Sequence, residues 1–405
     1  MKNRSLNLII ISCLFTIITV SSMALFNNYF NLPVYAKIGT APYFDDFAPF
    51  YSDFPIHLKW ALEGGSYSLL GPYLHFVNAL WSSSFAYALA MSLLICLTIA
   101  ASYYMQKYVI VSLGSKYNSY RLWYLSISSI FLCSIWIPFI YPFLYNNTTF
   151  VTQPWHNPTY IMMRPLAVVS LMLSFKMLSE YKKDLPLWKY AIYSFVLFIT
   201  NFAKPSFIVI YAPFVFVYCL IDLVHTKGKS FVPALKLGLS IVISLLPLVF
   251  QTIVLFDPNA AYKNEIAMQF SLGRFGGKIM LVLSMLSGLI FPTYIFLFLK
   301  KSGMGKDKLK KLNYTWILFG IALFERLFLY ERGPRGDSGN FAWGLIFFAY
   351  ILYIISMAYW EYGYSSVYIK SKKVYLSGYA IYGLNIICGV IYFILLQTGK
   401  FYRIF

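Results

Sequence analysis

Charged residues are scarce in this chain of 405 residues: Asp and Glu number 14, and residues of both signs make up 12%. The 5 cysteines all lie inside apolar runs, with neither the spacing of a disulfide framework nor that of a metal site. A soluble enzyme carries more charge, and a small secreted scaffold carries paired cysteines. These absences exclude soluble enzymes, secreted disulfide scaffolds and disordered tails.

Apolar residues make up 60% of the chain and aromatic residues 20%, which indicates an integral membrane protein. A helix needs about 20 mostly apolar residues to cross a bilayer. Reading apolar runs against charged breaks predicts about eleven spans, and thus an all-α, polytopic transmembrane bundle. The predicted spans are 7–26, 84–105, 122–145, 160–178, 188–203, 205–224, 237–256, 279–299, 314–330, 341–360 and 374–397.

The organisation predicted is a single integral membrane domain over residues 1–405. It comprises a first span (1–26), a long outer loop with interfacial helices (27–83), core spans (84–256) and C-terminal spans (257–405). Lys2 and Arg4 precede the first apolar run, as in a signal peptide, but ten further spans favour an uncleaved anchor.

The formal net charge of +19 is unevenly distributed along the chain. If the N-terminus is cytoplasmic, most of the 33 basic residues fall in cytoplasmic loops and most of the 14 acidic residues fall on the outer side. This is the asymmetry that the positive-inside rule requires, so we expect a plasma-membrane protein with its N-terminus inside and its C-terminus outside. Anionic headgroups explain the basic loops, and no folded basic domain is present to bind nucleic acid.

The first outer loop contains a short helical pattern between Asp53 and Glu63. We expect this helix to lie in the membrane interface, with Ser52 or Asp53 as its N-cap. Asp53 and His57 are four residues apart and share one face of the helix. A carboxylate there can act as general base for a substrate hydroxyl, while an N-cap aspartate beside an interfacial histidine is the structural alternative.

Asp45 and Asp46 form a second acidic site in the same loop. The pair fits a solvated turn, a group that orients the acceptor, or part of a divalent metal site. No cofactor and no metal-ligand set is predicted, although a divalent metal stays open as an alternative at these two carboxylates.

Several cations fall on the predicted outer side, where they could bind phosphate; they are Arg164, Lys204, Arg332 and Arg335. Lys204 is the most informative, because Pro205 ends the preceding helix and a charge in such apolar surroundings costs about 2.5 to 3.5 kcal/mol near mid-membrane. We expect it in a polar cavity, with snorkelling or pairing with Glu325 as alternatives. The loop 331–340, rich in glycine and charge, fits either a phosphate- or sugar-binding segment or a plain turn.

The arrangement of one anchor helix, a long first outer loop with an acidic residue on an interfacial helix, and a lysine–proline break resembles the GT-C fold membrane glycosyltransferases. The segment Asp53-Phe54-Pro55-Ile56-His57-Leu58-Lys59-Trp60-Ala61 is similar to the first-loop motif of that family, an Asp followed four residues later by Tyr or His and then a small residue. The resemblance covers about the first 230 residues. The family's frequent Asp-Glu pair is replaced by Asp53-Phe54.

The resemblance implies sugar transfer from a polyprenyl-phosphate carrier to an acceptor on the outer face. It makes Asp53 the base, with Asp46 the competing choice and His57 a neighbour that tunes the base or contacts the acceptor. Arg164, Lys204, Arg332 and Arg335 then bind the carrier phosphate, and Asp45, His156 and Asn340 contact acceptor or sugar. The family's large C-terminal soluble domain is missing, so the expected acceptor is a lipid-linked or cell-envelope glycan, and the expected partners are these two substrates and the bilayer.

Two other functions fit a many-span protein of this kind. A polymerase of lipid-linked repeat units also has outward-facing arginines, but its key loop often comes later in the chain. A flippase or transporter of lipid-linked sugars predicts internal repeats with broken helices in corresponding places. The Lys204-Pro205 break has no counterpart near residue 350, and acidic residues are almost absent from the spans, which disfavours transport.

Overall fold

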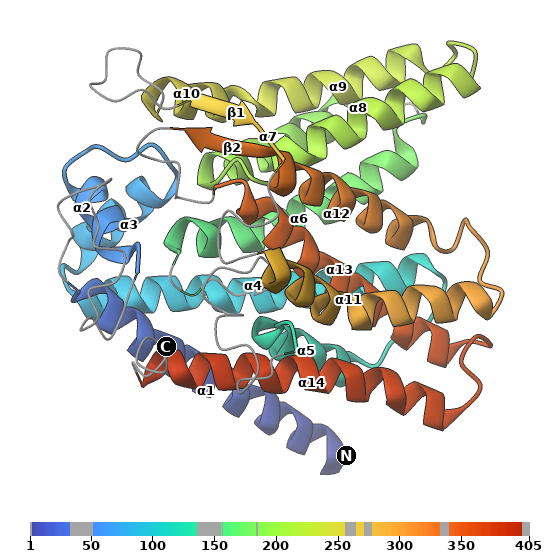
Figure 1. The fold of residues 1–405 in the computed structure, drawn as a ribbon, viewed down its shortest axis with the longest axis horizontal. Coiled ribbons are helices and arrows are strands. Elements are labelled where there is room, and N and C mark those ends of the chain that lie inside the picture. Colours follow the sequence, from blue (N-terminus) through green and yellow to red (C-terminus); the bar gives the residue numbers. More distant parts are fainter. Residues whose placement is uncertain are drawn as a thin grey trace.

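The computed structural model describes residues 2–32, 52–135, 155, 157–183, 185–255, 265–270, 278–332 and 340–398. These residues form an all-α bundle with one small two-stranded sheet (Figure 1). Its elements are α1 (Lys2–Phe30), α2 (Phe54–Leu62), α3 (Leu70–Leu80), α4 (Ser84–Ser112), α5 (Ser119–Ser128), η1 (Ser129–Phe131), α6 (Pro158–Glu180), α7 (Leu187–Ala203), α8 (Ile208–His225), α9 (Phe231–Ser244), α10 (Leu246–Leu255), β1 (Glu265–Met268), α11 (Lys278–Lys301), α12 (Lys310–Phe328), β2 (Leu329–Arg332), α13 (Ala342–Ser365) and α14 (Lys372–Gln397).

Within the described residues, eight helical stretches are long and apolar enough to cross a membrane. They are α1, α4, α6, α8, α9 together with α10, α11, α13 and α14. The multi-pass helical architecture expected from the sequence is therefore present. Of the other predicted spans, α7 has only 17 residues, and α12 has charged residues at both ends.

The predicted span 122–145 differs most from the structure. Helix α5 ends at Ser128, one turn of 3₁₀ helix follows, and Leu132 is already extended. Backbone carbonyls left by this ending are satisfied from α14, because Asn385 Nδ2 donates to the Cys133 carbonyl at 2.6 Å and the Tyr382 hydroxyl donates to that of Leu125 at 3.2 Å. Non-helical backbone is tolerated at membrane depth where protein groups bind it in this way.

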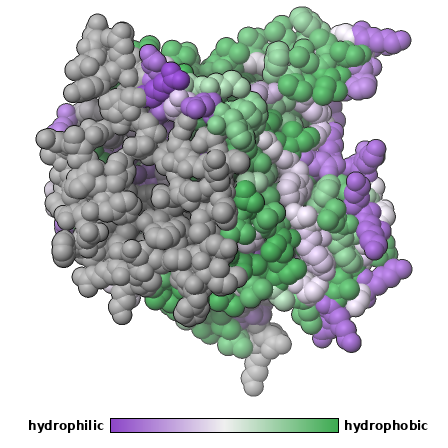
Figure 2. Space-filling view, in the orientation of Figure 1, coloured by the Kyte–Doolittle hydropathy of each residue, from purple (hydrophilic) through white to green (hydrophobic). Residues whose placement is uncertain are grey.

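Helix α13 forms the centre of the bundle. Nearly all of its residues are buried, and it packs against α4, α6, α11, α12 and α14. The surrounding helices instead expose apolar side chains, which form the hydrophobic surface in Figure 2. A helix that is apolar all round and surrounded by others makes the core, and the outer helices present their apolar faces to lipid.

The two ends of the bundle differ. The loops that join α8 to α9, α11 to α12 and α13 to α14 lie at the end opposite to α2 and α3 (Figure 1). These loops contain many of the lysines that the positive-inside rule assigned to the cytoplasmic side. Hydrophilic residues gather at this end in Figure 2. We call it the basic end. The common placement of these loops agrees with the charge asymmetry in the sequence.

Helices α2 and α3 cover the other end. Helix α2 occupies the predicted interfacial segment and stops where expected, because Gly64 takes the left-handed conformation (φ +77°) that closes a helix C-terminus. The loop before α3 is joined to the end of α7, as the Leu69 amide donates to the Phe202 carbonyl at 2.9 Å. The segment that contains α2 and α3 is thereby attached to the segment that carries Lys204.

Candidate functional site

Asp53 immediately precedes α2, which is anchored to the first helix by aromatic packing. Phe54 is fully buried, and its ring centroid lies 5.0 Å from that of Phe26, 5.5 Å from Tyr29 and 4.9 Å from Phe30. Because Phe54 follows Asp53 directly in the sequence, this packing fixes the position of the Asp53 backbone.

The Asp53 carboxylate does not cap its own helix. Asp53 occupies the N-cap position but makes no side-chain capping bond, and the Phe54 amide donates instead to Ser52 Oγ at 3.2 Å. Asn157 Nδ2, 104 residues later in the chain, donates to Asp53 Oδ2 at 2.8 Å. The carboxylate is thus directed across the structure toward α6.

A continuous row of hydrogen bonds leads from Asp53 to Lys204. Lys204 Nζ donates to Thr159 Oγ1 at 3.0 Å, and Thr159 Oγ1 donates to Asn157 Oδ1 at 2.9 Å. Asn157 in turn donates to Asp53, so all three hydrogen bonds have the same direction, with the donor on the Lys204 side and the acceptor on the Asp53 side. We call Asp53, Asn157, Thr159 and Lys204 the α6 network. Hydrogen bonds aligned in one direction polarise one another, so the network couples a cation to an anion.

The start of α6 organises this network. Asn157 is the N-cap of α6: its Oδ1 also accepts the Tyr160 amide at 2.9 Å, and Pro158 occupies the first turn, where proline is favoured. The positive end of the α6 dipole therefore lies beside the Asp53 carboxylate. Asn157 and Thr159 are both buried, so solvent screens these bonds little.

Lys204 occupies the break between α7 and α8. Its backbone is extended (φ −164°, ψ 129°), as expected before Pro205, and α7 ends one residue earlier. The ammonium lies 5.0 Å from the centroid of the Trp343 ring on α13. Gln251 Nε2 stabilises the break by donating to the Phe202 carbonyl at 3.1 Å. The surroundings of Lys204 thus include a hydroxyl group and an aromatic face.

Arg164 lies on the second turn of α6 and is only 3% exposed. Its guanidinium carbon is 3.7 Å from the centroid of the Tyr350 ring. The Tyr160 ring, one turn earlier on the same helix face, contacts Trp343 at 5.6 Å between centroids. Lys204 and Arg164 are thus linked through two aromatic residues, Trp343 and Tyr160.

The remaining described candidates lie around this core. His57 is one turn from Asp53 and packs edge-on against Trp60, with ring centroids 5.2 Å apart. Asn340 Nδ2 donates to Glu331 Oε2 at 2.7 Å, near the start of α13. Arg332 is exposed on β2 and donates through Nε to the Tyr330 hydroxyl at 2.8 Å, a bond that raises the pKa of the guanidinium.

Four candidates fall outside the described residues: Asp45, Asp46, His156 and Arg335. Their roles therefore stay predictions from the sequence. Within the described part of the chain, no cluster of three or more His, Cys, Asp or Glu side chains is arranged to hold a metal ion.

Sequence reasoning missed Asn157 and Thr159 as site residues. The pair Asn157-Pro158 before an apolar run is a signal for a helix start, and it could have placed Asn157 at the N-cap. Nothing in the sequence relates that position to Asp53, since the contact spans two separate segments. Trp343 and Tyr350 could not be singled out either, because aromatic residues make up 20% of the chain.

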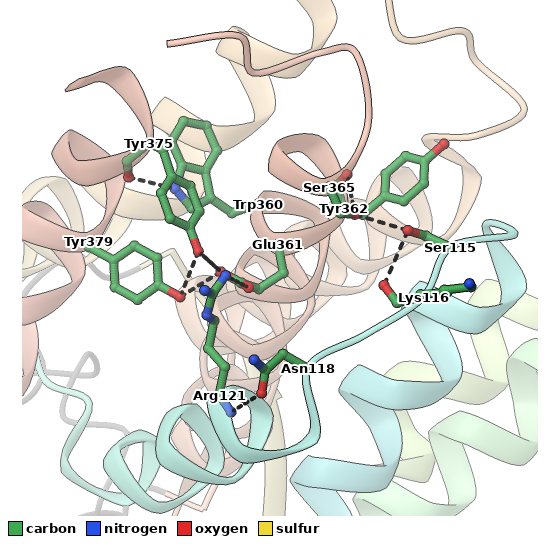
Figure 3. A network of polar contacts seen from close by, with 10 residues as sticks. All are labelled: Ser115, Lys116, Asn118, Arg121, Trp360, Glu361, Tyr362, Ser365, Tyr375 and Tyr379. Carbon is green, nitrogen blue, oxygen red and sulfur yellow. Dashed lines mark hydrogen bonds and ion pairs between the residues drawn. The ribbon is translucent and has the colours of Figure 1, made fainter. Parts of the chain in front are cut away.

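A second polar cluster joins α5, α13 and α14 near the basic end (Figure 3). Glu361 accepts from Arg121 Nη1 at 3.0 Å, from the Tyr375 hydroxyl at 2.6 Å and from the Tyr379 hydroxyl at 2.5 Å. Arg121 Nη1 also donates to the Tyr375 hydroxyl at 2.7 Å. Each charge here has a charged partner and further hydrogen bonds, which is the arrangement of a structural ion pair.

Comparison with known proteins returned no match: no protein-family model, curated protein or solved structure corresponds to this chain.

Proposed function

We propose that this protein is a membrane glycosyltransferase that moves a sugar from a polyprenyl-phosphate carrier to a lipid-linked or cell-envelope glycan on the outer face of the plasma membrane. The α6 network is the observation that carries the proposal. It connects the Asp53 carboxylate, which does not cap its own helix, to the ammonium of Lys204. Such a transfer needs both charges, an anion to act as base and a cation to bind phosphate.

In the proposed reaction Asp53 is the general base. Among the described residues Asn157 is its one side-chain donor, and it binds Oδ2, so Oδ1 remains to accept the proton of an acceptor hydroxyl. The acceptor oxygen then forms a bond to the anomeric carbon while the bond from that carbon to the carrier phosphate breaks. Lys204 stabilises the negative charge on the departing phosphate.

The geometry of the α6 network supports this division of roles. Asn157 holds the Asp53 carboxylate in one orientation, and Thr159 and Trp343 hold the Lys204 ammonium. Groups that are fixed before the reaction need no reorganisation when charge develops, which is the main source of electrostatic catalysis. His57 is well placed, one turn from Asp53, to contact the acceptor.

The test is sugar transfer by the purified protein with a panel of polyprenyl-phosphate-linked sugars. We expect Asp53→Asn to lower kcat by about 10²- to 10⁴-fold, the usual contribution of a general base. Glu63→Gln is the matched control, because Glu63 lies at the other end of the same helix, is 61% exposed and pairs only with Lys59 at 3.9 Å. Full activity of Asp53→Asn would remove Asp53 as the base, and loss of activity in Asp46→Asn would then assign that role to Asp46.

Lys204, which follows the end of α7, has a matched control near the start of that helix. Lys189, at the opposite end of α7, lies 5.9 Å from the centroid of the Trp188 ring and so repeats the lysine–tryptophan contact away from the α6 network. We expect Lys204→Met to reduce kcat/KM for the donor while Lys189→Met leaves it unchanged. Equal effects of the two substitutions would argue against a phosphate role for Lys204.

A further inference from the structure

Arg164 is a buried cation with no ion-pair partner among the described residues. It is 3% exposed, and its Nε and Nη2 make no hydrogen bond within the described part of the protein. The ion pairs found among the described residues involve other side chains, namely Lys59 with Glu63, Arg121 with Glu361, and Lys182 with Asp222. Burying an unpaired charge in a bundle costs several kcal/mol, so a guanidinium retained there needs a reason.

Arg121 shows how this protein neutralises an arginine when the purpose is structural. Its guanidinium binds the Glu361 carboxylate, and two tyrosine hydroxyls bind the same carboxylate (Figure 3). Arg164 has a tyrosine ring but, in the part of the chain that the structure describes, no carboxylate paired with it. The difference indicates that no acidic side chain among the described residues supplies the negative charge opposite Arg164.

The surroundings of Arg164 are rigid. The Tyr350 ring lies against one face of the guanidinium, 3.7 Å from its central carbon, and the Tyr350 hydroxyl is fixed by Ser102 Oγ at 2.6 Å and Ser129 Oγ at 3.1 Å. Two further helices thus hold the aromatic ring in place. The guanidinium is left to interact through its edge, where Nε and Nη2 point.

A third donor lies close by. The Tyr160 hydroxyl is buried and has no hydrogen-bond partner among the described residues, and it stands one helical turn before Arg164 on the same face of α6. Nε, Nη2 and this hydroxyl are all donors. Unsatisfied buried donors gathered around a positive charge make an environment that favours an anion.

We propose that Arg164 and Tyr160 bind a small inorganic anion of the halide class inside the bundle, between α6 and α13. Because Arg164 is almost completely buried, the site suits a compact ion better than a phosphate attached to a lipid. This inference does not depend on the proposed sugar transfer, and it gives Arg164 a role different from the carrier binding that the sequence suggested. The bound ion balances the charge of Arg164 and stabilises the packing of α6 on α13.

The test is the thermal unfolding of the full-length protein in detergent as bromide replaces gluconate at constant ionic strength. A ligand that binds only the folded protein raises the unfolding temperature with its concentration, so we expect a rise for the natural sequence. Arg164→Met should abolish the bromide dependence, and the control Lys189→Met should retain it. Tyr160→Phe, which removes one hydroxyl without changing the volume of the ring, should require about tenfold more bromide for the same shift.

Anomalous scattering from crystals grown in bromide gives a measurement that needs no variant. A bromide peak beside Arg164 and Tyr160 is expected, and crystals without such a peak would overturn the proposal. Bromide-dependent stabilisation that persists in Arg164→Met would also overturn the proposal. If polyprenyl phosphate in gluconate stabilises the natural protein through Arg164 and bromide does not, Arg164 binds the carrier and the small-anion site is wrong. None of these measurements uses sugar transfer, so failure here is distinguishable from failure of the proposed enzyme.

Discussion

Thr159 joins the two charged ends of the α6 network, so its hydroxyl is the most direct place to test the network. Thr159→Val keeps the shape of the side chain and removes only its hydrogen-bonding oxygen. The ammonium of Lys204 loses an acceptor at 3.0 Å, and Asn157 Oδ1 loses a donor at 2.9 Å but keeps the Tyr160 amide. Thr159 is 3% exposed, so water does not readily replace the lost bonds.

The expected size of the effect follows from these two bonds. A hydrogen bond to a charged group contributes about 1.5 to 3 kcal/mol. If that bond holds Lys204 against the departing phosphate, its loss lowers kcat/KM by about 10- to 150-fold. Thr159→Ser retains both hydrogen bonds and removes one buried methyl group, which costs only about 1 kcal/mol of stability. We therefore expect Ser to restore most of the transfer that Val removes.

The assay is transfer from a polyprenyl-phosphate-linked sugar by both variants, with thermal unfolding measured on the same preparations. A network that only stabilises the fold would lower the unfolding temperature of Thr159→Val and leave kcat/KM of the folded fraction unchanged. That result would refute the catalytic reading of the α6 network. So would equal losses in Thr159→Val and Thr159→Ser, since the hydroxyl would then not be the group that matters.

Two further predictions concern the packing of α13. A Cβ at Gly344 would lie 2.1 Å from Ile210 Cδ1 and 3.0 Å from the Ser206 carbonyl oxygen, so Gly344→Ala should lower the free energy of unfolding by about 1 to 3 kcal/mol. A Cβ at Gly320 would meet nothing within 4 Å, so Gly320→Ala should not lower it. Chemical unfolding in detergent measures the free energy of unfolding of both variants. Glu361→Ala removes the carboxylate that Arg121, whose side chain is 42% exposed, shares with the Tyr375 and Tyr379 hydroxyls, and should cost about 1 to 3 kcal/mol in the same assay. A cost no greater than that of Glu63→Ala would contradict the structural role assigned to this ion pair.

The sequence predicted the large-scale features of this protein because they depend on local composition. The membrane class, the interfacial helix after Asp53 and the helix break at Lys204 follow from apolar runs, from a pair of glycines and from proline. Each of these signals lies within the segment that it shapes. The structure contains the apolar spans, a helix over Phe54–Leu62 and the break at Lys204, while the interfacial position of that helix stays a prediction.

Features that depend on contacts between distant segments were not predictable in this way. The end of α5 at Ser128 is stabilised by Asn385 and Tyr382 from α14, more than 250 residues away in sequence, and a Cβ at Gly389 would lie 1.7 Å from the Phe131 carbonyl oxygen. The apolar run continues past Ser128, so composition alone predicts a continuous helix there. The hydrogen bond between Asn157 and Asp53 was not predictable either, because it joins segments 104 residues apart.

The central position of α13 has a consequence for how the protein is made. Trp343, Tyr350 and Glu361 all belong to this one helix and meet Lys204, Arg164 and Arg121 in turn along its length. Among the described helices that α13 packs on, only α14 follows it in the sequence, so none of these three cations can meet its partner until α13 has been synthesised. The contacts made by α13 are therefore completed late, whereas α1, α4, α6 and α7 can already pack against one another before Ala342 is synthesised.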